Sequence, residues 1–131
     1  MYAEKSLPKV NFHAYIAAHQ ECAANQNIVF KTVSYNDGSA YNVPDGVFTA
    51  PHPGNYIFAS NMRSAAKGTF INARMFANGK VVAQAYQLEG ATMNVMTSLK
   101  KGEKVHVQAL EKFTSHGNAP HVYFTGMLVS Q

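Results

Sequence analysis

The side chains that could perform metal or acid–base chemistry are six histidines and seven carboxylates, in a chain of 131 residues. None of the histidines stands at the spacing of a recognised metal motif such as H-E-x-x-H. Strand periodicity places His106 on one face with Gln108, which indicates an outward, solvated pair. His116 and His121 flank a loop across which they could approach each other. The pattern as a whole predicts no metal site.

Nucleophilic catalysis also lacks a recognisable pattern. There is no G-x-S-x-G sequence, and Cys22, the single cysteine, has no histidine-and-acid partnership beyond the nearby His19. Asp37 and Asp45 each precede a glycine in a turn sequence, where an aspartate typically caps the backbone. We therefore predict that the protein is not an enzyme, and that Cys22 is buried as a small apolar residue.

The charges are basic in balance but scattered along the chain. The formal net charge is +4, with eleven basic residues against seven acidic ones. The one tight basic group is Lys100, Lys101 and Lys104, and Arg63 and Arg74 are the two arginines. This is too sparse for a nucleic-acid partner. A mild, salt-screened attraction to anionic surfaces is one interpretation, and ordinary solvated turn lysines are the other.

These residues are carried by a strand-rich chain. Between residues 28 and 58, aromatic residues recur in short apolar runs separated by Asn-Asp-Gly, Pro-Asp-Gly and Pro-His-Pro-Gly. Asn78-Gly79 joins two further alternating runs, residues 69–77 and 80–88, as a hairpin. About ten short strands follow from this punctuation, among them residues 28–35, 93–99, 104–110 and 121–129. The prediction is all-β, with residues 1–9 as an arm and 10–131 as one domain. No apolar run is long enough to predict a membrane span.

The order of the aromatic and turn residues resembles one known family. The match to the signature of the complement C1q globular head domain consists of Phe30, Asn36, Tyr41, Phe48, Gly54, Tyr56 and Phe58. Ser60 stands where that signature has another aromatic residue. Further likeness lies in Asn78-Gly79, in Leu99-Lys-Lys-Gly and in Phe124-Thr-Gly-Met-Leu, which resembles the closing F-x-G-x-L.

The resemblance implies a fold and an assembly. It implies a ten-stranded jelly-roll sandwich of the tumour necrosis factor/C1q-like type that assembles as a homotrimer. Tyr56, Phe58, Tyr123 and Phe124 are then candidates for the trimer interface or for the sandwich interior. Alternation puts Tyr123 and Phe124 on opposite faces, so one is expected in the core and the other at the interface.

The resemblance also bears on ions and on location. Some members of the family bind calcium through acidic loop groups, and calcium requires several oxygen ligands. This chain has two aspartates, both in other turns. The sequence therefore predicts no cofactor, with calcium the one ion that the resemblance leaves open. The chain is similar to the stand-alone C1q-domain proteins of invertebrates, which implies a secreted, extracellular protein.

Two functions are compatible with these features. The first is a non-enzymatic innate-immune pattern-recognition protein, lectin-like, that binds lipopolysaccharide or other microbial polysaccharide. The alternative is a trimeric signalling or assembly ligand for a protein receptor, cytokine-like or synaptic-organiser-like. In the first case the ligand would contact loops, where function concentrates. The candidate loop residues are Arg63, Lys67, Lys100, Lys101, Lys104, Ser115, His116 and Asn118.

Overall fold

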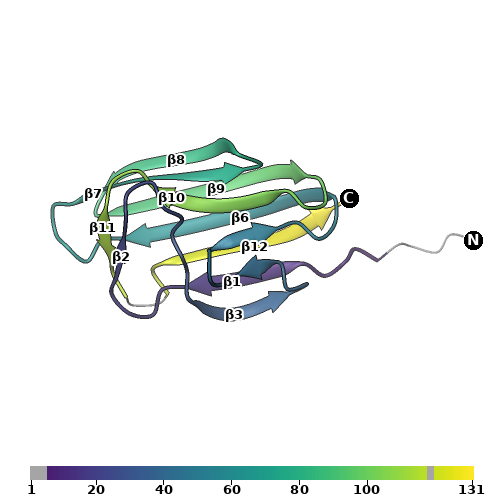
Figure 1. The fold of residues 1–131 in the computed structure, drawn as a ribbon, viewed down its shortest axis with the longest axis horizontal. Helices are drawn as coiled ribbons and strands as arrows, with labels where there is room; N and C mark the ends of the chain where they lie inside the picture. The colour runs from purple at the N-terminus through teal and green to yellow at the C-terminus, as the bar shows by residue number, and fades with distance from the viewer. Residues whose placement is uncertain (1–5, 118–119) are drawn as a thin grey trace, which may run out of the picture.

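Ten of the strands form a sandwich of two five-stranded antiparallel sheets in the computed structural model, which describes residues 6–117 and 120–131 (Figure 1). The first sheet has, in order, β3 (Thr32–Asp37), β1 (Asn11–Tyr15), β12 (Tyr123–Ser130), β6 (Gly54–Arg63) and β9 (Gly90–Leu99). The second has β4 (Tyr41–Asn42), β5 (Val47–Thr49), β10 (Lys104–Ala109), β7 (Phe70–Ala77) and β8 (Lys80–Leu88). A separate pair closes one end, β2 (Gln20–Cys22) with β11 (Phe113–Ser115). The predicted ten-stranded jelly roll is confirmed.

The aromatic signature residues form the core between the two sheets. Phe12 stacks on Tyr41 and Phe48, with ring centroids 5.0 and 5.3 Å apart, and meets the edge of Phe124 at 4.9 Å. The Tyr41 hydroxyl donates to the carbonyl of Phe30 at 2.9 Å and accepts from its N–H at 3.0 Å. Because both hydrogen bonds are satisfied, a tyrosine is tolerated in an otherwise apolar interior. Its burial raises the pKa of the Tyr41 hydroxyl.

Two turns explain why particular residues are needed between the strands. Asn78 and Gly79 have φ values of 51° and 75°, the left-handed pair that a tight hairpin between β7 and β8 requires. The predicted hairpin is therefore confirmed. Asn36 closes the turn before β4 with its side chain, which donates to the Tyr41 carbonyl at 2.8 Å and accepts from the Tyr41 N–H at 3.1 Å.

Some strand boundaries differ from the prediction. Residues 28–31 were predicted as the start of a strand, but β3 begins at Thr32. Ile28 and Phe30 are buried, and the Ile28 N–H bonds to the Val107 carbonyl at 2.8 Å, so this segment packs on the core without forming a ladder. The strand predicted from residue 93 begins at Gly90. Strands β2, β4 and β11 were not predicted, because two or three residues are too few to show a period.

Candidate functional site

The outward face of the first sheet carries a row of apolar side chains among the polar ones expected on a solvated surface. Strand register places Met127, Ile57 and Met96 side by side across β12, β6 and β9. Their exposed fractions are 47%, 38% and 63%. Monomeric proteins expose few contiguous apolar patches of this kind, and such patches commonly mark interaction sites. We call this side of the first sheet the apolar face.

An aromatic cluster continues the apolar face over β1, β3 and β12. The ring of His13 lies 6.3 Å from Tyr15, 6.1 Å from Tyr35 and 5.4 Å from Tyr123. Burial among these rings lowers the pKa of His13 below its usual value. The imidazole is therefore held in its neutral form at physiological pH, which suits a surface that excludes water.

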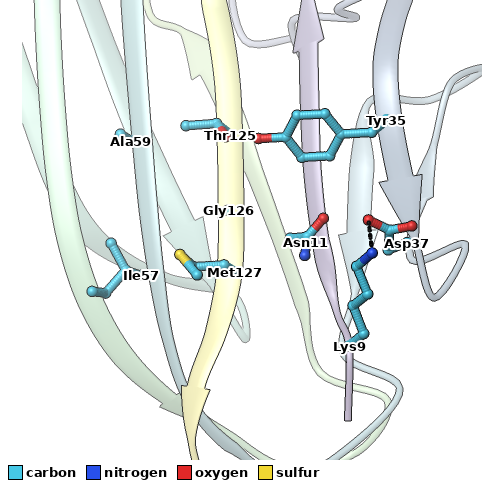
Figure 2. Close-up of a pocket in the computed structure, with 9 residues that line it drawn as sticks. All are labelled: Lys9, Asn11, Tyr35, Asp37, Ile57, Ala59, Thr125, Gly126 and Met127. Atoms are coloured by element: carbon cyan, nitrogen blue, oxygen red, sulfur yellow. Dashed lines mark ion pairs between the residues drawn. The ribbon is translucent and has the colours of Figure 1, made fainter. Parts of the chain in front are cut away.

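A groove of about 430 Å³ runs along the apolar face (Figure 2). Figure 2 shows Ile57 and Met127 on one side of this groove and Lys9, Tyr35 and Asp37 on the other. Lys9 Nζ lies 3.7 Å from Asp37 Oδ2, the one ion pair of residues 6–117 and 120–131. This pair forms a charged border to a groove whose other lining is largely apolar, with Asn11 and Thr125 as its polar side chains. The arrangement fits a protein surface better than a small polar substrate.

The candidate interface aromatics lie on two sides of the first sheet. Tyr56, Phe58 and Phe124 are fully buried in the sandwich interior. Tyr123 points outward onto the apolar face and is half-buried. Ser60, which replaces a signature aromatic residue, is buried and donates its hydroxyl to the Tyr123 carbonyl at 3.0 Å.

Apart from Tyr123, the residues of the apolar face were not assigned from the sequence. This face is formed by Tyr35, Ile57, Met96 and Met127, together with His13 and Tyr15. The available signal was the alternation along β6 and β12: residues next to the inward Tyr56, Phe58 and Phe124 must point outward. Ile57 and Ala59 are apolar outward neighbours on β6, which alternation alone does not explain on a solvated sheet, whereas Asn55 and Thr125 are polar.

Two of the three candidate loops meet at one end of the sandwich, on the left in Figure 1. The His116 N–H donates to the Arg63 carbonyl at 2.8 Å, which ties the segment after β11 to the loop after β6. Arg63 and Lys67 are exposed there. Ser115 is buried and donates its hydroxyl to the His116 carbonyl at 3.1 Å, so its side chain stabilises the loop and faces away from solvent. Asn118 lies outside the described residues.

The third candidate loop lies at the opposite end, on the right in Figure 1 with the C-terminus. Glu103 closes the turn between β9 and β10: its Oε1 accepts from the Lys100 N–H at 2.7 Å, and its own N–H donates to the Lys100 carbonyl at 3.1 Å. Lys101 and Lys104 line a groove of about 550 Å³ beside this turn. We call it the lysine groove, lined by Asn27, Val47, Asn78, Gly79, Lys101, Gly102, Glu103, Lys104 and His106.

His106 is not the solvated residue that its alternation with Gln108 indicated. Its ring stacks on Phe76, with centroids 5.2 Å apart and planes 14° apart, and its Nδ1 is buried with no hydrogen-bond partner among the described residues. Burial lowers the pKa of His106, while Asp45 acts in the opposite direction. The prediction failed because the neighbouring strand supplies an aromatic side chain on the same outward face.

Within residues 6–117 and 120–131, no three His, Cys, Asp or Glu side chains are grouped so that they could hold a metal ion. The His116 ring lies 5.0 Å from His19, and His19 Nδ1 accepts from the Gly117 N–H at 3.0 Å. Cys22 is buried, as predicted, and burial raises the pKa of its thiol to about 11. The thiol is therefore protonated and inert as a nucleophile.

We expect acidification to destabilise the folded protein through His13. The unfolded chain has an ordinary histidine pKa near 6.5 and the folded chain a lower one, so the unfolded state binds more protons between the two. Stability should therefore fall as the pH is lowered from about 7.5 through 6.5 toward the folded pKa. Thermal midpoints at several pH values check this, and His13→Gln should show a smaller fall than the wild type. Part of the fall should remain, since the pKa of His106 is also lowered. Equal falls in the two proteins would contradict the assignment to His13.

Comparison with known proteins identifies sequences that are similar to this chain. A sequence model described as "C1q domain" matches residues 11–129. Multimerin-2 of Mus musculus is 29% identical over 119 residues, which is 88% of this chain and 12% of that protein. The chain therefore spans about an eighth of that relative. In the part of the chain that the structure describes, no helix is long and apolar enough to cross a membrane.

Solved structures show the same fold at low sequence identity. The globular domain of zebrafish complement 1qA superposes with a TM-score of 0.76 at 15% identity, covering 94% of this chain and 98% of that one. The Eiger TNF of S. frugiperda gives 0.80 at 10% identity, with 95% of each chain covered. Murine APRIL gives 0.72 at 7% identity, with 92% and 99% covered.

Proposed function

The chain belongs to the C1q domain family, and from that premise we propose that it is a secreted, non-enzymatic recognition protein. In this proposal it acts as a homotrimer and binds anionic molecules of microbial surfaces, such as lipopolysaccharide. The observation that carries the proposal is the combination of an exposed apolar face with basic loops whose charges are not compensated.

The apolar face supports the homotrimer. Tyr35, Ile57, Met96 and Met127 are each more than a third exposed in one chain, and covering them removes apolar area from water. A ring of three identical subunits closes when one surface of each chain meets a different surface of the next. A second copy is the occupant that fits, because the resemblance to the C1q head domain implies a trimer.

The unpaired lysines support an anionic ligand. Among the described residues, the single ion pair joins Lys9 and Asp37, so Lys100, Lys101 and Lys104 have no acidic partner within ion-pair distance. Glu103 is the acid nearest in sequence, and its carboxylate accepts from a backbone N–H. Phosphate groups of lipopolysaccharide would meet these lysines without displacing an existing partner. Three copies in a trimer convert weak contacts into avid binding.

We expect the double variant Lys101→Glu/Lys104→Glu to lose at least about tenfold in apparent affinity for immobilised lipopolysaccharide, since six charges are reversed in each trimer. Surface plasmon resonance at two salt concentrations measures this, and the wild-type signal should weaken as salt rises. The matched control is Lys31→Glu/Lys112→Glu, which changes the net charge equally at two exposed sites outside the groove. Equal loss in both variants, or none in either, would remove the lysine groove from the proposal. A parallel series with a chelator tests calcium.

One observation favours the protein-receptor alternative. Phe70, Tyr86 and Leu88 form an exposed patch on β7 and β8, where Phe70 pairs with Leu88 and stacks on Tyr86 with centroids 5.1 Å apart. Exposed aromatic residues of this kind are enriched at protein–protein interfaces. The lipopolysaccharide assay distinguishes the two functions. If the wild type binds no microbial glycan, the alternative function, binding of a protein receptor through this patch, is favoured.

A further inference from the structure

We propose that the outward face of the second sheet holds an acidic sugar residue, with the guanidinium of Arg74 binding its carboxylate or sulfate. The inference rests on the proposed function, because it narrows the anionic ligand to an acidic glycan and adds a subsite outside the loops. The sequence alone identified Arg74 only as one of two arginines. Its position in the second sheet makes it a candidate for binding the anionic group of a sugar.

Arg74 lies at the centre of this face without a counter-ion. It is on β7, opposite Gln108 of β10 on one side and Gln84 of β8 on the other. The side chain is half-buried, and its Nε is buried with no hydrogen-bond partner among the described residues. A buried, unpaired donor on a charged group is costly, and native structures seldom leave one without a reason. A ligand oxyanion would contact the accessible part of the guanidinium group and would supply the counter-ion that this half-buried charge lacks.

A second unsatisfied nitrogen lies on the same face. Register pairs His106 with Phe76 and Gln108 with Arg74, so His106 and Arg74 are diagonal neighbours within reach of one ligand. The His106 Nδ1 is also buried without a partner. Period two along β10 puts Lys104 on this face as well, and both Lys104 and His106 line the lysine groove. Lys104 and Arg74, with the His106 ring between them, thus form a strip that leads from the groove onto the sheet.

The neighbours of the strip suit a sugar. Gln84 donates to the side-chain oxygen of Asn72 at 3.1 Å, and Gln108 donates to that of Asn27 at 3.1 Å. Each pair leaves amide donors and acceptors free for hydroxyl groups. The amides of Asn72, Gln84 and Gln108 project from strands, which hold them in place more precisely than loops would, while Asn27 lies between β2 and β3. A charged group beside ordered amides fits an acidic glycan better than a purely electrostatic partner such as nucleic acid.

The experiment uses the fact that the chain has two arginines, Arg63 and Arg74. In a ¹⁵N-labelled sample their side-chain Nε–H groups give two resonances, which Arg63→Lys and Arg74→Lys assign. The protein is titrated with a heparin-derived tetrasaccharide, with tetragalacturonate, and with neutral chitotetraose as the control. We expect the Arg74 resonance to shift saturably with an acidic tetrasaccharide and to stay in place with the neutral one. The sulfated and the carboxylated probe show which oxyanion is preferred.

Affinity measurements on variants complete the test. Arg74→Lys should weaken binding of the acidic tetrasaccharide about fivefold to tenfold, because lysine keeps the charge and loses the bidentate fork. Arg74→Gln should weaken it further, and Lys31→Gln, at an exposed site outside the lysine groove, should leave it unchanged. Backbone amide spectra show whether each variant is folded. An Arg74 resonance unmoved by both acidic probes, or an undiminished affinity in folded Arg74→Gln, overturns the proposal.

The two proposals fail differently. One outcome is that Arg74→Lys binds lipopolysaccharide like the wild type while Lys101→Glu/Lys104→Glu does not. That result supports the recognition function and contradicts the subsite on the second sheet. If an acidic tetrasaccharide shifts the Arg74 resonance while the wild type does not bind lipopolysaccharide, the sugar subsite is supported. The proposal of a microbial lipopolysaccharide ligand is then contradicted.

Discussion

Replacing Ile57 by glutamate is expected to convert the proposed homotrimer into folded monomers. Ile57 lies in the middle of the apolar face, between Met127 and Met96 on the neighbouring strands. In a closed trimer the variant would bury three unpaired carboxylates, and each buried charge costs several kcal/mol. The side chain points away from the sandwich interior, so the fold of the single chain should survive.

Light scattering coupled to gel filtration measures this outcome. The wild type should have three times the 14.3 kDa mass of one chain, and Ile57→Glu should have the mass of one. Val81→Glu is the matched control, since Val81 is a comparably exposed apolar residue on β8 of the second sheet, and it should remain a trimer. A trimeric Ile57→Glu variant would show that the subunits do not meet through this face. A monomeric wild type would remove the homotrimer from the proposal.

Replacing Gly126 by alanine is expected to lower the free energy of unfolding by about 3 kcal/mol, the upper part of the range for overpacked cores. An added Cβ would lie 2.5 and 2.7 Å from two ring carbons of Phe58 and 2.8 Å from a ring carbon of Phe12. Both rings are fully buried and packed against other aromatic rings, so neither can move without displacing its neighbours. This crowding gives a physical reason for the glycine in the closing F-x-G-x-L sequence.

Urea denaturation at one protein concentration checks this value, because the stability of an oligomer depends on concentration. Gly79→Ala is the control, since an added Cβ there meets no atom within 4 Å and the residue has φ of +75°. It should cost about 1 kcal/mol from backbone strain alone. If Gly126→Ala costs no more than Gly79→Ala, steric exclusion by the Phe12 and Phe58 rings does not explain the glycine.

The sequence was sufficient to predict those structural features that depend on residues close together in the chain. Alternation of apolar and polar residues predicted β6, β7, β8, β10 and β12, because residues two apart in a strand face the same side. Asn78 and Gly79 predicted their hairpin, because few residues adopt the left-handed backbone that it needs. Cys22, the lone cysteine, was predicted to be buried as a small apolar residue, and its thiol is buried.

The candidate site depended on packing between distant segments. Alternation predicts that Ile57 and Met127 face away from their buried neighbours. That they lie beside Met96 in one exposed row is known only from the register of the paired strands. Likewise, Arg63 meets His116, just after β11, at one end of the sandwich, while the lysine groove lies at the other. The candidate loop residues predicted from the sequence therefore lie on two separate surfaces.

The fold class, the hairpin and the two faces of each long strand could be read from the amino-acid order, since these follow from backbone preferences and from the period of a strand. The neighbours that each face receives became known from the folded structure. It stacked His106 on Phe76, placed Arg74 between two glutamines without a counter-ion and brought two phenylalanine rings against Gly126. The physical reason is that pairing between strands brings together residues far apart in the chain, and burial, charge compensation and space depend on those partners.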